Sequence, residues 1–264
     1  METEARPLRF TPALLARPVP SGIDVVTTLH DFAILTWAIP PERLRPHVHE
    51  RFALTTVRID GFERALLSAV PFEDHDFRAG AFPSPRFRFG QTNYRAYVVD
   101  RETGEHAAWF FGTVLDSWSV VIPRFVWKLP WHRGRVRFDC ARDESGSYRR
   151  WCMKTVSRWA SCEVELADLG QAPRELAGFS NLESGWVVLT HPLVGYYWRR
   201  DGTLGTYRIW HERIAATAAR ATVVRFDLLD RLGLVPFAEQ RLLHSALLTP
   251  RVEFQVQLPP RASN

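Results

Sequence analysis

Cysteine, lysine and long hydrophobic runs are all scarce in this sequence of 264 residues. Its three cysteines, Cys140, Cys152 and Cys162, form no C-x-x-C pair, which argues against a disulfide framework and against a cysteine zinc site. No run reaches the roughly 18 apolar residues of a membrane helix, and the N-terminal segment METEARPLRF lacks the apolar core of a signal peptide. We therefore expect a cytoplasmic protein that does not bind membranes.

Arginine carries almost all of the positive charge, because Lys128 and Lys154 are the only lysines among 34 basic residues. The formal net charge of +5 raises the question of nucleic-acid binding. However, the arginines are scattered along the chain, and such a bias is more typical of a GC-rich genome than of a phosphate-binding surface. We expect no nucleic-acid partner, since that function would require the arginines to converge on one stripe of the surface.

Apolar residues make up 46% and charged residues 24% of the chain, which is ordinary for a globular protein. Aromatic residues reach 12%, with ten tryptophans, and this favours strands and a ring-lined pocket over a helical bundle. The sequence contains no internal repeat and no linker. It therefore predicts an extended, proline-rich N-terminal arm over residues 1–22 and a single domain over residues 23–260.

Segments rich in β-branched and aromatic residues recur at about ten-residue spacing, which is typical of an antiparallel barrel or sandwich. We predict strands over residues 23–39, 52–59, 62–71, 91–100, 106–116, 133–138, 148–156, 159–166, 186–191, 196–200, 207–213 and 251–258. The pairs Asp60-Gly61 and Asp201-Gly202 predict hairpin turns. We expect short helices over residues 41–48 and after Asp227 as N-cap, loops over 72–89 and 167–185, and either helix or strand over 214–226.

A proline corner separates two different halves of the stretch 118–138. The apolar half, residues 120–127, is predicted to be buried, and the alternating half, residues 133–138, to be a strand with one wet face. Pro130 restricts the backbone at the junction, so that Trp131 and His132 are held where a buried segment ends.

One predicted strand places three polar side chains on the same face. Strict alternation puts Asn93, Arg95 and Tyr97 together, and they offer an amide, a guanidinium and a phenol to a small acidic or carbonyl ligand. The alternative is that this face is exposed to solvent, or that Arg95 pairs with Asp116 in a structural role. Asp116 is kept among the candidate ligand-binding residues.

His132 is the candidate catalytic residue, because imidazole titrates near neutrality and can move a proton at a cavity mouth. A structural histidine bonded to a backbone carbonyl is the alternative. Trp131 is predicted to pack against the body of the ligand, and with Trp109, Phe110 and Phe111 it would form either a cavity wall or an ordinary core. The adjacent His211 and Glu212 point to opposite faces of a strand, so only one can enter a pocket, and His211 is the candidate.

Metal binding is not predicted. The cluster Glu73-Asp74-His75-Asp76 contains ligand types, but its tight spacing suits a solvated turn better. His132, His191 and His211 would converge only if their strands were neighbours. We expect neither a metal nor another cofactor, and the sequence has no G-x-S-x-G hydrolase motif.

Several motifs in this order resemble the DUF2071, or YqjF-like, family of the acetoacetate decarboxylase-like superfamily. They are W-x-x-P-P-E-R-L-R-P at 37–46, L-x-x-V-P-F at 67–72, N-x-R-x-Y-V at 93–98, W-F-F at 109–111, R-F-x-x-x-L-P-W-H at 124–132 and L-T-H at 189–191. The resemblance spans roughly residues 25–258. It implies a mainly antiparallel β-barrel with a few short helices and a central cavity.

In the decarboxylase branch of that superfamily, a lysine forms an imine with a β-keto acid and a second lysine lowers its pKa. The resemblance places Trp131 and His132 at these positions, and neither can form an imine. Lys128 lies three residues before Trp131, on the opposite face of a regular strand, and is more simply a surface lysine. We expect a protein that binds or acts on a small acid or carbonyl compound without Schiff-base chemistry, as a lyase-like enzyme or a carrier. The alternative is a non-catalytic interaction module whose cavity is filled by its own rings.

Overall fold

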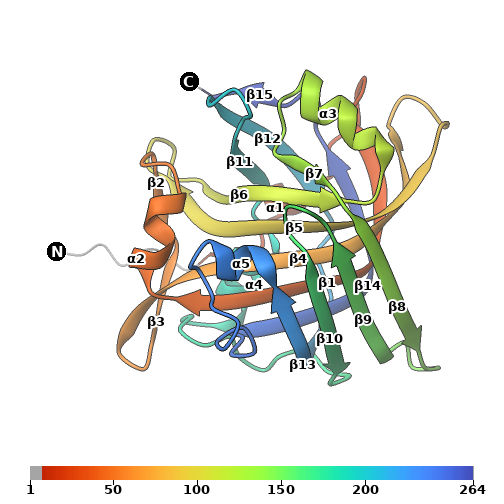
Figure 1. Cartoon of the computed structure of the whole chain (residues 1–264). Coiled ribbons are helices and arrows are strands. Elements are labelled where there is room, and N and C mark those ends of the chain that lie inside the picture. The colour runs from red at the N-terminus through yellow and green to blue at the C-terminus, as the bar shows by residue number, and fades with distance from the viewer. Residues whose placement is uncertain (1–7, 264) are drawn as a thin grey trace.

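The computed structural model describes residues 8–263, about half of which belong to one large, strongly curved β-sheet (Figure 1). Its strands are β1 (Val25–Ile39), β2 (Phe52–Leu54), β3 (Thr56–Ile59), β4 (Phe62–Ala79), β5 (Phe87–Asp100), β6 (His106–Leu115), β7 (Trp131–Arg133), β8 (Arg135–Arg142), β9 (Tyr148–Val156), β10 (Cys162–Asp168), β11 (Val194–Trp198), β12 (Leu204–His211), β13 (Thr217–Phe226), β14 (Ser245–Val256) and β15 (Arg261–Ala262). The helices are α1 (Pro12–Leu15), α2 (Pro41–Leu44), α3 (Val121–Val126), α4 (Leu182–Thr190) and α5 (Asp227–Arg231), with 3₁₀ turns η1 (Arg45–His47) and η2 (Trp118–Val120). The predicted mainly β class with a few short helices is confirmed.

The sheet closes on itself and so forms the ring predicted from the sequence. Hydrogen-bonded neighbours run in the order β12, β11, β6, β5, β4, β1 and β14, and pairing of Ile209 on β12 with Val256 on β14 joins the two ends. Neighbouring strands of the ring are antiparallel except β6 and β11, which are parallel. Closure pairs the two end strands of the ring with each other, so that neither β12 nor β14 is left as an unpaired edge.

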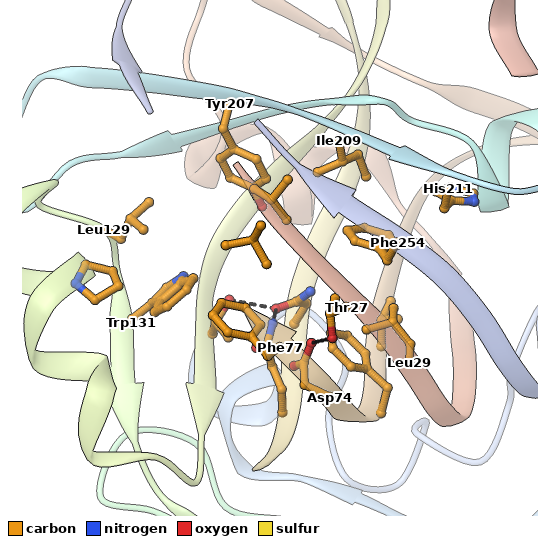
Figure 2. A pocket seen from close by; sticks show the side chains of 18 of the residues that line it. Thr27, Leu29, Asp74, Phe77, Leu129, Trp131, Tyr207, Ile209, His211 and Phe254 are labelled. Carbon is orange, nitrogen blue, oxygen red and sulfur yellow. Dashed lines mark hydrogen bonds between the residues drawn. The ribbon is translucent and has the colours of Figure 1, made fainter. Parts of the chain in front are cut away.

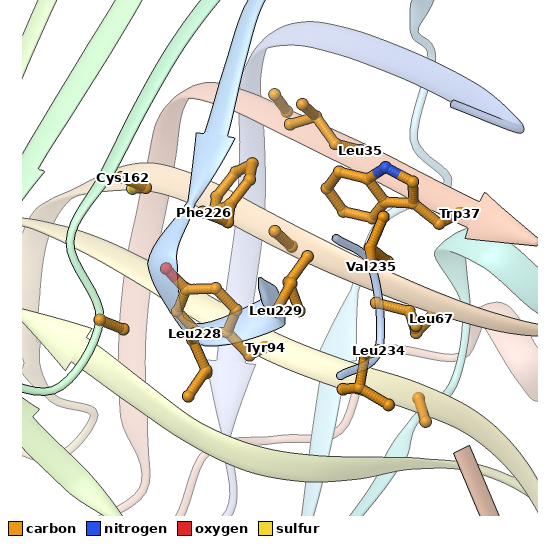
Figure 3. Packing of buried hydrophobic residues seen from close by; sticks show 14 of the residues in the cluster. Leu35, Trp37, Leu67, Tyr94, Cys162, Phe226, Leu228, Leu229, Leu234 and Val235 are labelled. Carbon is orange, nitrogen blue, oxygen red and sulfur yellow. The ribbon is translucent and has the colours of Figure 1, made fainter. Parts of the chain in front are cut away.

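A second layer covers the outside of the ring. Strands β8, β9, β10 and β13 continue the sheet beyond β14 and, together with α5, pack against β1, β4 and β5 (Figure 1). Figure 3 shows Trp37, Tyr94 and Phe226 in the core between the layers; the rings of Trp37 and Phe226 meet edge to face with centroids 5.5 Å apart. Trp37 also donates from Nε1 to the carbonyl of Gln240 at 2.8 Å, so its one polar atom is satisfied.

Alternation along β5 explains why one strand serves two compartments. Tyr94 points outward into the core between the layers, whereas Asn93 and Arg95 line the interior of the ring. A second apolar cluster lies on the inner side, where Val70 of β4 packs with Trp186 and other residues of α4. Helix α4 therefore covers one end of the ring.

Both hairpin turns predicted from the sequence are present. The hairpin between β3 and β4 turns at Asp60-Gly61, and the positive φ of both residues, 51° and 81°, gives the strand twist that a two-residue hairpin requires. The hairpin around Asp201-Gly202 joins β11 and β12 as predicted, with Trp198 opposite Leu204.

Three predicted segments are corrected. Residues 72–89 are mostly strand, because β4 continues to Ala79 and β5 begins at Phe87. Residues 186–191 belong to α4 rather than to a strand, and the side chain of Asn181 caps that helix by accepting from the amide of Ser184 at 2.8 Å. The N-cap of α5 is Phe226, and Asp227 lies in its first turn.

The prediction that the apolar run 120–127 is buried is also corrected, because much of it is exposed. After β6 the chain forms η2 and α3 at the rim of the ring, where only one side of each turn meets the domain. Val120 is buried, but Val121, Phe125 and Val126 are 53%, 56% and 62% exposed.

The described part of the predicted N-terminal arm, residues 8–22, follows the surface and includes the single turn α1. Its contacts are specific: Trp210 donates from Nε1 to the carbonyl of Leu15 at 3.1 Å, and Arg17 pairs with Glu253 at 3.0 Å. Residues 1–7 of the arm lie outside the described residues.

Candidate functional site

A cavity of about 430 Å³ lies inside the ring, between β1, β4, β5, β6, β7, β12 and β14. In Figure 2, Leu129 and Trp131 stand on one side of it and His211 and Phe254 on the other, with Tyr207 facing Thr27 and Asp74. Most of the lining is apolar, and the polar or charged side chains in it are Thr27, Asp74, Gln91, Asn93, Arg95, Thr113, Thr190, Tyr207 and His211. The alternative expectation, a ring whose cavity is filled by its own aromatic residues, is therefore not met.

Arg95 brings a buried positive charge to this cavity. Its side chain is 7% exposed, and Nη2 donates to the carbonyl of Leu189 at 2.9 Å. The hydroxyl of Tyr97 donates to the same carbonyl at 3.0 Å. That carbonyl lies in the last turn of α4, where backbone carbonyls have no amide partner within the helix. The two side chains of β5 therefore supply the hydrogen bonds that this carbonyl lacks. The Nε atom of Arg95, however, is buried without a hydrogen-bond partner among the described residues.

Asn93 is held in one orientation by its neighbours. Its Oδ1 atom accepts hydrogen bonds from Nε2 of Gln91 at 2.9 Å and from Oγ1 of Thr113 at 2.7 Å. Both bonds are accepted by the oxygen and neither involves the side-chain NH₂, so the NH₂ group of Asn93 is positioned to donate to a ligand.

Asp74 is the second ionisable group of the lining and is 2% exposed. Thr27 donates from Oγ1 to Oδ1 of Asp74 at 3.0 Å, whereas Oδ2 is buried without a partner among the described residues. Burial disfavours the charged form and raises the pKa of Asp74 to about 7, although the bond from Thr27 opposes this shift. Near neutral pH this carboxyl group can therefore both donate and accept a proton.

His211 lies in the cavity wall, next to His191. Its ring is 4.1 Å from that of His191, centroid to centroid, and stacks on Phe254 at 5.5 Å. Burial lowers the pKa of His211 to about 4 and that of His191 to about 3, so both rings are neutral at pH 7. Arg95 is thus the one cation at neutral pH among the described lining residues.

The proline corner brings Trp131 to the cavity but turns His132 away. Trp131 lies opposite Thr113 in the pairing of β6 and β7 and lines the cavity. His132, the next residue on the strand, points to the other side and stacks on Trp159 at 4.0 Å with the ring planes only 3° apart. Burial lowers the pKa of His132 to about 4, and the ring is not part of the lining. The prediction that it moves a proton at the cavity is therefore corrected.

Two other candidates also lie outside the cavity. Asp116 is exposed, and its Oδ2 accepts from the amide of Val136 at 3.3 Å, so it pairs neither with Arg95 nor with a ligand in the ring. Tyr97 shares a face with Arg95 but is buried behind it, and its hydroxyl is bonded to Ser68 at 2.7 Å. Tyr97 therefore helps to position Arg95, with which it shares the carbonyl of Leu189 as acceptor.

Neither lysine reaches the cavity. Lys154 pairs with Glu163 at 3.3 Å on the exposed side of the outer layer. Lys128 precedes the proline corner with a positive φ of 58°, and its carbonyl accepts from the amide of Arg200. The lining residues include no lysine.

Sequence reasoning missed Asp74, Thr27, Gln91 and Thr113. Asp74 was assigned to a solvated turn, but β4 extends through it and its face continues the inward positions of Val70 and Phe72. The signal that would have found it is this alternation, which runs on past Pro71. Gln91 stands two residues before Asn93 on the face that was correctly identified.

The arrangement of a mainly antiparallel ring around a cavity defines the class: the chain has the acetoacetate decarboxylase-like fold. The enduracididine biosynthesis enzyme MppR, complexed with pyruvate, superposes with a TM-score of 0.62 at 11% identity, over 98% of this chain and 98% of that chain. An acetoacetate decarboxylase-like enzyme from Sphingomonas wittichii RW1 gives a TM-score of 0.56 at 9% identity, over 94% and 92%. Acetoacetate decarboxylase from Legionella pneumophila gives 0.50 at 10% identity, over 96% and 94%.

The chain belongs to the DUF2071 family, which is described as an uncharacterized conserved protein and whose sequence model matches residues 26–252. A search of curated proteins finds no match. Within residues 8–263, no helix is long and apolar enough to cross a membrane, and no group of three or more His, Cys, Asp or Glu side chains is placed to hold a metal ion.

Proposed function

We propose that the protein binds a monocarboxylic acid or an acidic carbonyl compound inside the ring, with Arg95 as the partner of its anionic group. The observation that supports this most directly is the buried Arg95, whose Nε–H finds no acceptor within residues 8–263. A buried cation without a counter-charge is costly, and a carboxylate would supply both the charge and the acceptor. The pyruvate of the MppR complex is a ligand of this chemical type.

Two further residues complete the proposed site. The amide of Asn93, fixed by Gln91 and Thr113, donates to a second oxygen of the ligand. Trp131, which lies level with Asn93 across β6, packs against its apolar body. In this proposal the chemistry does not pass through an imine, and the lack of a lysine among the described lining residues supports that part of it.

A second candidate function, acid–base catalysis on the bound compound, is favoured by Asp74. Its Oδ2 has no partner in the part of the chain that the structure describes, and its pKa is raised to about 7, which suits a group that gives and takes a proton near neutrality. In this proposal Asp74 replaces His132 as the proton-transfer group. It would act on a carbonyl or hydroxyl group in the body of the ligand rather than on the carboxylate.

A thermal-shift screen with keto acids, hydroxy acids and aromatic carboxylates tests the binding proposal. A ligand at 100 times its Kd stabilises the folded protein by about 2.7 kcal/mol, and this stabilisation should disappear in Arg95→Ala and persist in part in Arg95→Lys. Arg137→Ala, which removes an exposed arginine of β8, is the matched control. Equal stabilisation of Arg95→Ala and the native protein by every binding acid would overturn the proposal.

A further inference from the structure

We propose that the ligand is an elongated amphiphilic acid, of the medium-chain fatty acid type, with its carboxylate at Arg95 and its apolar body extending to the mouth of the ring. This inference rests on the proposed function and specifies the class of ligand. It follows from the position of the charge, the length of the cavity and the composition of its rim.

The charge lies at the closed end of the cavity. Arg95 is surrounded there by Thr190 and His211, each 2% exposed, and α4 covers this end through the carbonyl of Leu189. The other lining residues toward this end, such as Val70, are apolar and buried. An anionic group held at Arg95 is therefore at the bottom of the cavity rather than at its opening.

The cavity is long compared with a three-carbon acid. Asp74 pairs with Phe89 across β4 and β5, and both of these residues line the cavity, as does Arg95 further along β5. The backbone from Phe89 to Arg95 spans about 20 Å at roughly 3.3 Å per residue. The volume of about 430 Å³ also falls in the range of roughly 300–1,000 Å³ of sites that hold drug-sized ligands.

The open end is apolar even where it meets solvent. Trp118 and Ile23 line the rim at 66% and 46% exposure, and Phe77 and Phe87 are half-buried beside them. Strand β1 begins at this rim and β4 ends at it, and Val25 of β1 pairs with Ala79 of β4. A ligand that was polar at both ends would leave its outer polar group against these rings, whereas an alkyl chain would be buried by them.

Calorimetric titration with butanoic, hexanoic, octanoic and decanoic acids, each below its micelle concentration, tests this inference. Burial of each added methylene should tighten binding about fourfold until the chain fills the cavity. Arg95→Ala should weaken the binding of decanoic acid strongly but leave that of decan-1-ol unchanged. Ala79→Trp, which adds bulk at the mouth, should weaken decanoic acid and spare hexanoic acid.

The outcomes separate this inference from the proposed function. If butanoic and decanoic acids bind equally well and both depend on Arg95, the inference fails and the proposed function stands. If chain length matters but Arg95→Ala binds the acids normally, both fail. If none of these four acids binds, the inference fails, and the thermal-shift screen with keto acids, hydroxy acids and aromatic carboxylates decides the proposed function. Thermal melts of each variant without ligand show that a loss of binding is not a loss of folding.

Discussion

The hydroxyl of Thr27 donates to Oδ1 of Asp74 across 3.0 Å, and the other oxygen of the same carboxyl group is buried with no partner among the described residues. One hydrogen bond from a hydroxyl of β1 does not offset the cost of burying the charged carboxylate, so burial raises the pKa of Asp74 to about 7. A satisfied structural aspartate would show the opposite shift, as Asp100 does: Arg51 bonds both of its oxygens and its pKa falls to about 2.

Asp74→Asn should change the pH dependence of stability. Because the folded-state pKa of Asp74 lies above its ordinary value of 3.8, its stabilising contribution is complete below pH 3.8 and is lost as pH rises through about 7. The variant lacks this loss, so its free energy of unfolding should rise relative to that of the native protein between pH 5 and pH 8, by on the order of 3 kcal/mol at most. Urea unfolding at both pH values measures it. Asp76→Asn, at an exposed position, is the control.

Lys128→Arg should leave ligand binding unchanged, since Lys128 is not part of the lining. For the same reason, borohydride added with pyruvate or another keto acid should give no covalent adduct on the native protein, by intact mass. The substitution keeps the positive charge and prevents imine formation, so it separates charge from covalent chemistry. An adduct that appears with the native protein and is absent from Lys128→Arg would show that the imine-free proposal is wrong.

The sequence predicted the parts of the site that local rules control. Alternation correctly placed Asn93 and Arg95 on the same face of β5, because successive side chains of a strand point to opposite faces. Trp131 was found at the proline corner. His132 was assigned to the same hollow, although the same alternation turns it toward Trp159.

The remaining errors concern long-range packing. Acidic residues at 73–76 look like a turn until β1 and β5 are known to flank them on both sides. The apolar run at 120–127 predicts burial, but it lies at the rim of a cavity, where apolar side chains are exposed for want of a covering layer. In both cases the burial depends on elements distant in the sequence, so the residues near the segment do not determine it.

Gly112→Ala should destabilise the protein by about 2 kcal/mol or more. A Cβ atom there would lie 2.8 Å from the backbone oxygen of Pro130 and 2.6 Å from the ring of Trp159, and the backbone of the corner cannot move without shifting β7. We also expect weaker ligand binding, because β7 carries Trp131. Gly146→Ala is the comparison: its Cβ meets nothing within 4 Å, so only the cost of its positive φ, about 1 kcal/mol, should appear. Equal melting temperatures of the two variants would contradict the crowding at the corner.

His191→Phe should make the protein more resistant to acid. Burial holds the folded-state pKa of His191 near 3, below its ordinary value of 6.5, so the unfolded chain takes up a proton first as pH falls. The native protein therefore loses stability from about pH 6.5 downward, and His211, whose pKa is about 4, adds to the loss. Phenylalanine removes one of the two titrating rings and also the buried, unpartnered Nε2 atom, while it can keep the edge-to-face contact with Phe10. Denaturant unfolding at pH 5 and pH 8 should show a larger advantage of the variant at pH 5, and parallel curves at the two pH values would refute the assignment of acid sensitivity to His191.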